Sequence, residues 1–312
     1  MKILVTGATG FIGTNLLPYL RQHITGVEFL CLTRKKTGKP GELLWEELAQ
    51  RHFDDVDGVI HMAGLAHDTK KALDDSAYYK VNYELTKLLY DYYLKSNARK
   101  FIYVSSVKAV ADSVDGVLSE DVHPTPVTAY GKSKLQAEDY IRQLSLGVNR
   151  KSFYILRPCM VHGPGNKGNL NLLYKFAVKG LPYPLGAYNN SRSFLSVENF
   201  CYVCHQLLIR DIQSGVYNLS DDEPMSVKDL FGVIGKAIGR KAPMLNIPKP
   251  LVAAMAGIGT TLKLPFNTER LNKLTENYVV SNAKIKAALS VDKFPVSVTD
   301  GIERTIASFQ NN

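Results

Sequence analysis

Lys2-Ile3-Leu4-Val5-Thr6-Gly7-Ala8-Thr9-Gly10-Phe11-Ile12-Gly13 is the stretch that decides the fold of this 312-residue chain. Its first five residues predict a short buried parallel strand, and residues 14–20 continue as a helix. In that context Gly7 permits the tight turn, Gly10 lets a pyrophosphate approach the backbone, and Gly13 lets helix and strand pack closely. The helix N-terminus then faces the phosphates. The stretch predicts a dinucleotide-binding unit whose cofactor contacts Gly7, Gly10, Phe11, Ile12 and Gly13.

Apolar runs farther along the chain predict more strands of the same sheet. They cover residues 27–32, 57–64 and 100–104, and helical periodicity runs from Tyr79 to Leu94. Strands that alternate with helices indicate a doubly wound parallel α/β sheet of the Rossmann type. Ligands of such sheets bind at the carboxyl ends of the strands, where Gly7, Ala63 and Ser106 fall.

The residue after the second predicted strand bears on the choice of cofactor. Dinucleotide folds often place an acid there to bind the adenosine ribose, but this chain reads Thr33-Arg34-Lys35-Lys36. Arg34 could accept a 2′-phosphate, which favours NADP over NAD. A solvated basic loop is an equally good interpretation, so the cofactor is predicted as NAD(P).

Tyr130 and Lys134 stand four positions apart, so a helix carries both on one face. A phenol titrates near pH ~10, but a neighbouring ammonium favours the phenolate and lowers its pKa. Such a tyrosine can exchange a proton with a carbinol or carbonyl oxygen. An ordinary amphipathic helix is the alternative for the pair alone. The preceding dinucleotide unit and the hydroxyls of Ser105 and Ser106 favour the chemical interpretation.

Composition restricts the class of protein. The net charge of +9 suits anionic ligands, yet no motif that reads RNA or DNA accompanies the basic residues, so we expect no nucleic-acid partner. The chain enters a strand directly instead of a signal peptide, and the longest apolar run, residues 251–261, is too short to span a bilayer. A cytoplasmic protein without a membrane span is expected.

The four cysteines do not predict a disulfide framework or a metal site. Cys201 and Cys204 form a C-x-x-C followed by His205, but no further ligands stand at suitable spacing. Their apolar neighbours predict a buried helix instead.

The second half of the chain predicts a smaller α/β region. Expected elements are a strand at 152–156, helices at 169–179, from 198 and from 226, and a strand at 215–219. We expect a cofactor domain over 1–160, to which 193–220 returns, and a substrate domain over 161–192 and 221–312. Ser226 and Asp229 form a predicted capping box.

Five motifs together resemble the extended short-chain dehydrogenase/reductases, in particular their nucleotide-sugar epimerase/dehydratase group. The motifs are Gly7-x-x-Gly10-x-x-Gly13, Asn82 in Val81-Asn82-Tyr83-Glu84, Ser105-Ser106, Tyr130-x-x-x-Lys134 and Arg157-Pro158. Their order and spacing cover nearly the whole chain. The resemblance implies a Rossmann domain with a smaller C-terminal substrate domain, and it also implies a homodimer.

The resemblance assigns roles to individual residues. Tyr130 is the catalytic acid/base, Lys134 lowers its pKa and holds the nicotinamide ribose, and Ser106 binds the sugar oxygen. Ser106 is preferred to Ser105 because Asp112, six residues on, matches the usual spacing of the family. Further cofactor contacts are implied for Ala63, Gly64, Asn82, Ser105 and Pro158.

Three residues are implied to bind the substrate. Asn169 would contact the diphosphate, and Arg192 would bind a phosphate through its bidentate fork, with Arg270 a second candidate for that task. The alternatives are a helix cap for Asn169 and surface ion pairs for the two arginines.

The chain departs from two subgroups of that family. Sugar dehydratases carry an acidic pair after the active hydroxyl, where this chain has Val107 and Lys108, which argues against dehydration. The usual 4-epimerases have an acid near the position of Arg34. Residues 181–187 and 190–193 look most like bacterial surface-polysaccharide enzymes.

The expected function is hydride transfer at C4 of a UDP-hexose or UDP-N-acetylhexosamine, either as a C4 epimerase or as a reductase of a 4-keto-6-deoxy sugar. A reductase of small ketones or aldehydes and a non-catalytic dinucleotide-binding protein are the alternatives.

Overall fold

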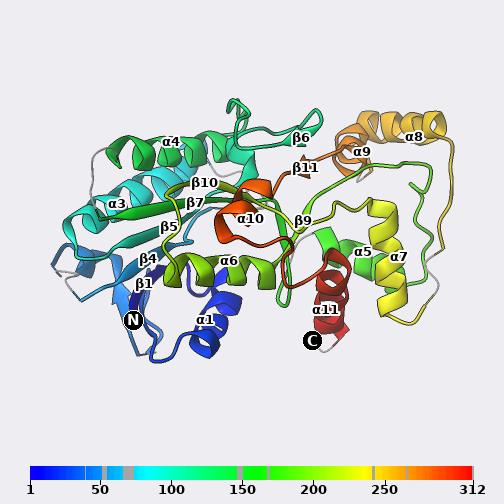
Figure 1. Ribbon diagram of the computed structural model, residues 1–312. Helices are drawn as coiled ribbons and strands as arrows, with labels where there is room; N and C mark the ends of the chain where they lie inside the picture. The colour runs from blue at the N-terminus through cyan, green and yellow to red at the C-terminus, as the bar shows by residue number, and fades with distance from the viewer. Residues whose placement is uncertain are drawn as a thin grey trace.

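The core of the computed structural model is one parallel sheet with helices on both faces (Figure 1). The structure describes residues 1–38, 40–50, 55–65, 74–145, 150–166, 169–240, 243–264 and 266–310. The seven strands lie in the order β10-β7-β5-β4-β1-β2-β3 and every neighbouring pair is parallel. Their bounds are β1 Lys2–Thr6, β2 Glu28–Thr33, β3 Glu42–Leu44, β4 Gly58–His61, β5 Lys100–Val104, β7 Ser152–Pro158 and β10 Gly215–Leu219. The predicted doubly wound Rossmann sheet is confirmed.

The two faces of the sheet bury alternate residues of the same strands. Ile3 and Val5 join an apolar cluster with α1 (Phe11–His23) and α6 (Val197–Ile209). Leu4, between them, joins the cluster of the opposite face, which includes α3 (Leu85–Lys95) and α4 (Ala129–Leu144). This alternation is the period of two expected of a strand buried on both faces.

The helix predicted from Tyr79 to Leu94 is interrupted near its start. A short α2 (Asp75–Tyr78) leads into a π-helical segment, Tyr79–Glu84, before α3 begins. Asn82 lies in the π-helical segment and is fully buried. Wide helical turns of this kind occur often at functional sites.

Most of the remaining helices pack beyond the carboxyl ends of the strands, whereas α10 (Ala283–Leu289) lies against the sheet beside β10 (Figure 1). Two small parallel sheets pair β8 (Met160–His162) with β9 (Phe194–Ser196), and β6 (Val117–Leu118) with β11 (Val279–Val280). The helices are α5 (Asn169–Val178), α7 (Val227–Ala237), α8 (Lys249–Thr261), α9 (Thr268–Thr275), α10 (Ala283–Leu289) and α11 (Val298–Gln310), and 3-10 turns cover Trp45–Gln50 and Val107–Ala109. A third apolar cluster, which includes Leu170, Phe231 and Ile302, fills the centre of this region.

Several local predictions can be compared directly with these elements. The Ser226 hydroxyl accepts a hydrogen bond from the Asp229 N–H at 2.9 Å, so the predicted cap of α7 is confirmed. Cys201 and Cys204 lie buried in α6, and the described residues contain no group of three side chains able to hold a metal ion. None of the helices in the described ranges is long and apolar enough to cross a bilayer.

Candidate active site

The glycine loop sits at the carboxyl end of β1 and is shaped by close backbone approaches. Gly7 has a φ of +73°, and a Cβ on it would lie 2.8 Å from the Ala63 nitrogen. A Cβ on Gly13 would lie 2.4 Å from the Gly7 oxygen. Both positions require glycine because the backbone conformation or the neighbouring backbone excludes a side chain.

The same loop fits a dinucleotide. Gly10 caps α1 without a side chain, and a Cβ there would meet only the Gly7 oxygen, at 3.3 Å, so its other sides are open. The first turn of α1 carries no acid and includes Phe11, Ile12 and Gly13, whose N–H groups have no acceptor within the helix. An open helix N-terminus of this kind suits a pyrophosphate.

Arg34 follows β2 directly and is exposed, at the carboxyl edge of the sheet where the sequence placed it. The adjoining residues of this loop are held by acids that the sequence did not connect with it. Lys36 pairs with Glu47 at 2.8 Å, and the Thr37 N–H donates to Glu42 at 2.6 Å. These two contacts hold the part of the loop that follows Arg34 in place.

Ser106 and Tyr130 come together from different elements and share a hydrogen bond. Asp112 organises the approach to α4, because its carboxylate accepts the N–H groups of Val127 at 2.8 Å and Thr128 at 3.3 Å. Thr128 then caps the helix through the Gly131 N–H at 3.2 Å. A Cβ on Gly131 would lie 2.3 Å from the Lys108 oxygen, so α4 touches the turn after Ser106 backbone to backbone.

Burial raises the pKa of Tyr130, while the hydrogen bond to Ser106 lowers it and nearby Tyr78 raises it. Lys134 is not among these influences, so its predicted lowering of the Tyr130 pKa stays a prediction. The half-buried phenol of Tyr130 packs edge-on against the ring of Tyr78, with the centroids 6.2 Å apart. This structure holds Tyr130 as a protonated phenol at neutral pH.

The Lys134 ammonium lies at the carboxyl end of β5. It donates to the Val104 carbonyl at 2.9 Å and lies 4.9 Å from the centre of the Tyr103 ring. A Cβ on Gly64 would stand 3.1 Å from its Nζ, so the ammonium borders the loop after β4. Burial lowers the pKa of Lys134 to about 8, against an opposing effect of Glu138.

A buried ion pair that the sequence analysis did not assign lies behind these residues. Glu138 is four positions after Lys134 on α4 and binds Arg157 of β7, whose Nε is 3.0 Å from both carboxylate oxygens. Ser105 donates its hydroxyl to the same carboxylate at 2.5 Å. The spacing from Tyr130 through Lys134 to Glu138 is the signal that could have found it.

Ser105 and Asn82, both predicted to contact the cofactor, bond to protein groups. Ser105 turns to Glu138, whereas Ser106, next in the chain, faces Tyr130. The Asn82 amide oxygen accepts the Leu65 N–H at 2.8 Å, and its nitrogen donates to Ser133 at 3.1 Å. Ala63 and Pro158 end up at the carboxyl ends of β4 and β7, with the Ala63 N–H donating to the Thr6 hydroxyl at 3.0 Å.

The predicted substrate residues lie farther out. The Arg192 guanidinium donates to the Lys273 carbonyl and stands 3.5 Å from Glu276. This ion pair is the alternative to phosphate binding that the sequence analysis considered for Arg192. The pair lies at the border of the candidate site. Arg270 is an exposed residue of α9, and its backbone N–H is bound by Asn267 at 2.9 Å. Asn169 begins α5, but its side chain lies outside the described part of the chain.

Lys108 lies between Ser106 and Arg192, a link that the sequence analysis did not predict. Its ammonium donates to the Asp112 carbonyl at 2.7 Å and lies 4.4 Å above the Tyr278 ring. The Tyr278 hydroxyl donates to the Ala111 carbonyl at 2.7 Å, and the Ser193 N–H donates to the Tyr278 carbonyl at 2.9 Å. One continuous set of contacts thus runs from Ser106 to Arg192.

Comparison with known proteins agrees with this geometry. Residues 3–220 match the model of the NAD dependent epimerase/dehydratase family. The chain is similar to a UDP-glucose 4-epimerase of Vibrio cholerae, at 29% identity over 99% of this chain and 95% of the relative. It is also similar to an N-acetyl-alpha-D-glucosaminyl-diphospho-ditrans,octacis-undecaprenol 4-epimerase of Escherichia coli O157:H7, at 25% identity over 98% and 94% of the two chains.

Among solved structures, the UDP-N-acetylglucosamine 4-epimerase of Bacillus cereus superposes with a TM-score of 0.79 at 22% identity, covering 99% of each chain. That likeness concerns the fold. The family match spans the glycine loop, Ser106, Tyr130 and Lys134. On these grounds, the chain belongs to the NAD dependent epimerase/dehydratase family.

Proposed function

We propose that this protein is an NAD(P)-dependent enzyme that transfers hydride at C4 of a UDP-hexose or UDP-N-acetylhexosamine. One observation carries the proposal: the hydrogen-bonded pair of Ser106 and Tyr130 lies at the same sheet edge as the buried Lys134 ammonium and the open glycine loop. A hydroxyl donor and a phenol can together stabilise charge that develops on one sugar oxygen.

The side chains then divide the proton chemistry between them. When bound, the nicotinamide would supply or accept the hydride at C4. Tyr130, a protonated phenol, would donate its proton to the C4 oxygen in the reductive direction and take it back in the oxidative one. Ser106 would hold the same oxygen by a hydrogen bond. In the described structure Lys134 has one hydrogen-bond acceptor, so two of its N–H donors are left for a ribose.

The diphosphate of the substrate would be held by Arg192 across the contacts that run from Ser106. Its planar fork suits phosphate oxygens, and Glu276 would be exchanged for them on binding. Asn169 and Arg270 are proposed as secondary contacts. We propose further that the substrate region comprises 161–192 and 221–312, and that the protein is a homodimer.

Epimerase and reductase share this set of residues, and one assay separates them. The protein is incubated with UDP-N-acetylglucosamine or UDP-glucose without added cofactor, and the C4 epimer is measured. Turnover supports an epimerase that retains its cofactor. Strict dependence on stoichiometric NADPH and a 4-keto sugar supports a reductase. Failure of both reactions contradicts the proposed function.

A sugar carried by a lipid diphosphate is a second candidate substrate. The Escherichia coli relative is named for a sugar attached through a diphosphate to undecaprenol. Arg192 would bind the diphosphate of either carrier, so the contacts of this site do not choose between nucleoside and lipid.

A further inference from the structure

Helix α8 exposes its large apolar side chains and buries only small ones. Leu251, Met255, Ile258 and Leu262 follow one another at helical spacing along its length, and they are 54%, 50%, 59% and 63% exposed. The side that faces the protein is built from smaller residues, namely Val252, Ala256 and Gly259. A contiguous row of large exposed apolar side chains marks a surface that binds something.

The small residues explain how α8 is held without its large ones. A Cβ on Gly259 would lie 1.8 Å from the Phe266 oxygen, so the helix touches the following segment through its backbone. Thr260 and Thr268 join α8 to α9 by a hydroxyl–hydroxyl bond of 2.9 Å. The exposed row is therefore not needed to attach the helix, and its four side chains serve another purpose.

The charge around α8 identifies the partner as an anionic surface. Residues 249–263 contain no aspartate or glutamate, and Glu269 of the adjoining α9 is paired with Lys273 at 2.7 Å. Lys249 begins the helix and Lys263 follows its end, so cations flank the apolar row at both ends. Apolar side chains between basic flanks are the pattern of helices that lie in the plane of a membrane with acidic lipids.

Helix α8 is too short to cross a bilayer, but it can lie on the surface of one. Thirteen residues give a length of about 20 Å, whereas the hydrocarbon core is about 30 Å thick. Figure 1 shows α8 at the outer rim of the molecule, beyond the carboxyl edge of the sheet. The large side chains can enter the headgroup region while Lys249 and Lys263 remain among the phosphates.

The helix is also tied to the proposed diphosphate site. α9, which α8 contacts through Thr268, supplies the Lys273 carbonyl that binds Arg192. We propose that α8 docks the protein on an anionic membrane surface, and that the site takes sugar diphosphates whose other end is anchored in that membrane. This inference rests on the proposed C4 chemistry and names the carrier of its substrate.

Binding to vesicles tests the docking directly. The full chain is mixed with vesicles of phosphatidylcholine alone, or with about one third phosphatidylglycerol, and the bound fraction is measured by sedimentation. We expect binding to the anionic vesicles that weakens with salt, and a reduction of at least about tenfold in Ile258→Glu. The matched control is Ile209→Glu, since Ile209 is 49% exposed at the end of α6 and should leave binding unchanged.

The substrate is tested with the same two variants. N-acetylglucosamine linked by a diphosphate to a polyprenyl chain is placed in the anionic vesicles, and its C4 epimer or reduced product is measured. Ile258→Glu should slow this reaction at least about tenfold and leave turnover of water-soluble UDP-N-acetylglucosamine unchanged.

The outcomes separate the two proposals. If the soluble sugar is converted but neither vesicle binds, or Ile258→Glu binds as the wild type does, the docking is wrong while the C4 chemistry stands. If Ile258→Glu instead turns a dimer into a monomer and no vesicle binds, a second copy of the chain covers α8 and the inference is overturned. If neither sugar reacts, the proposed function itself fails.

Discussion

Lysines at both edges of the central sheet donate to backbone carbonyls, but the half-buried lysines of one edge and the buried lysine of the other use their donors differently. At the amino edge, Lys100 donates to the carbonyls of Leu207, Leu208 and Arg210, at 3.0, 3.0 and 2.5 Å. At the carboxyl edge the described structure gives Lys134 a single acceptor, the Val104 carbonyl. An ammonium has three N–H donors, so one lysine is saturated by protein and the other is not.

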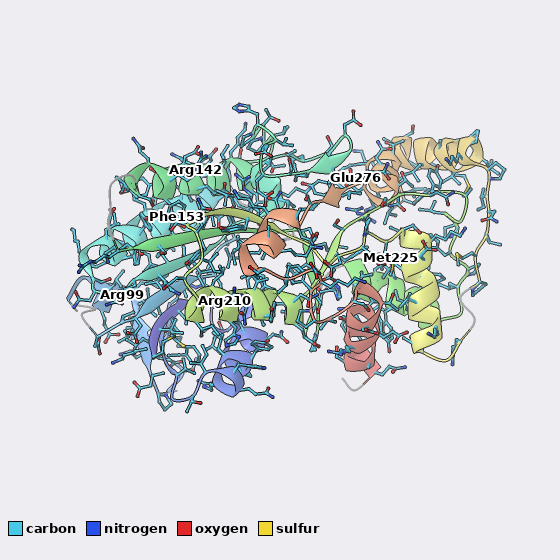
Figure 2. The ribbon with its side chains drawn as sticks, viewed as in Figure 1. Arg99, Arg142, Phe153, Arg210, Met225 and Glu276 are labelled. Atoms are coloured by element: carbon cyan, nitrogen blue, oxygen red, sulfur yellow. The ribbon has the colours of Figure 1, made fainter. Side chains whose placement is uncertain are left out.

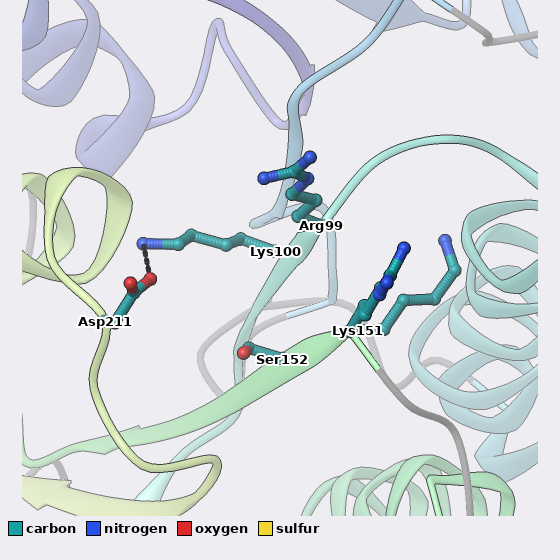
Figure 3. A pocket seen from close by; sticks show the side chains of 6 residues that line it. Arg99, Lys100, Lys151, Ser152 and Asp211 are labelled. Atoms are coloured by element: carbon teal, nitrogen blue, oxygen red, sulfur yellow. Dashed lines mark ion pairs between the residues drawn. The ribbon is translucent and has the colours of Figure 1, made fainter.

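Lys151 repeats the arrangement of Lys100 at the amino edge. It donates to the carbonyls of Tyr93, Ser96 and Ala98 at 2.9, 2.7 and 2.8 Å, where α3 ends. These two lysines line a cavity of about 540 Å³ together with Arg99, Arg150, Ser152 and Asp211 (Figure 3). Figure 2 shows Arg99 near one end of the molecule, well apart from Glu276, which lies beside the candidate site.

The role in the chemistry proposed for Lys134 has a structural counterpart that Lys100 and Lys151 lack. Positive charge is common to both edges, and the cavity lies at the amino edge. What distinguishes Lys134 is the number of donors that the protein leaves unused, in a place where Gly64 keeps the neighbouring backbone bare. Cations at the end of a helix stabilise its carbonyls, which accounts for Lys100 and Lys151.

Removing the phenol at the carboxyl edge should have the largest effect on activity. Tyr130→Phe deletes the proton donor and the bond to Ser106, so turnover should fall roughly a thousandfold while the cofactor still binds. Steady-state rates on the UDP-sugar and cofactor fluorescence measure the two effects. Turnover within about tenfold of the wild type would remove Tyr130 from the mechanism.

Two substitutions, one at each edge, should separate the roles of the lysines. Lys134→Met should reduce turnover roughly a hundredfold. It should also raise the free energy of unfolding at neutral pH by up to about 3 kcal/mol, because burial lowers the pKa of Lys134 to about 8 from an ordinary 10.5. Lys151→Met should have the opposite pattern, with turnover retained and a loss of about 1–3 kcal/mol, because three carbonyls lose their donor.

The sign of the pH dependence follows from the direction of that shift. Below about pH 8 the folded protein bears the full penalty of the buried ammonium, and between about 8 and 10.5 the unfolded chain binds more protons. The contribution of Lys134 to stability thus becomes more favourable as the pH rises through this window. Urea titrations of wild type and Lys134→Met at pH 7 and pH 9.5 measure it, and a constant difference between the two proteins would contradict the assignment.

A third experiment asks whether the contacts beyond the carboxyl edge bind a diphosphate. Arg192→Ala should raise KM for the sugar diphosphate roughly ten- to hundredfold with little change in kcat, since charge-assisted hydrogen bonds to phosphate are lost. Arg142→Ala is the control, because Arg142 is an exposed arginine of α4 (Figure 2). An unchanged KM would favour the reductase of small ketones or aldehydes.

The smallest expected effect concerns the cofactor. Arg34→Ala should lower the preference for NADPH over NADH roughly tenfold, because one cation facing a 2′-phosphate is removed. Lys35→Ala, next in the same exposed loop, is the matched control. Equal ratios of kcat/KM for the two cofactors in all three proteins would show that the loop is merely solvated.

The parts of the fold predicted well are those with strong local patterns. β5 and β10 have the predicted bounds, and the helix that carries Tyr130 and Lys134 forms where their spacing placed it. Residues 37–54 resisted interpretation because β3 has three residues, too few to show a period. The pattern of residues 79–94 was helical, but its π-helical start depends on how Asn82 packs.

The candidate site was predictable as a set of residues but not as an electrostatic arrangement. Whether the pKa of Tyr130 rises or falls depends on burial beside Tyr78, which lies 52 positions earlier in the sequence. The Arg192 ion pair with Glu276 likewise joins residues 84 positions apart. Contacts over such separations leave no periodic trace in the chain.

Gly131 has a consequence for anyone who would transplant this chemistry into another scaffold. The hydroxyl of Ser106 and the phenol of Tyr130 keep their distance because two main chains meet at Gly131, where a single methyl group would lie 2.3 Å from the Lys108 oxygen. A graft that copies the three proposed catalytic side chains but lets another residue follow the tyrosine would push the two oxygens apart. Gly131, the smallest residue of the motif, thus sets the spacing between Ser106 and Tyr130.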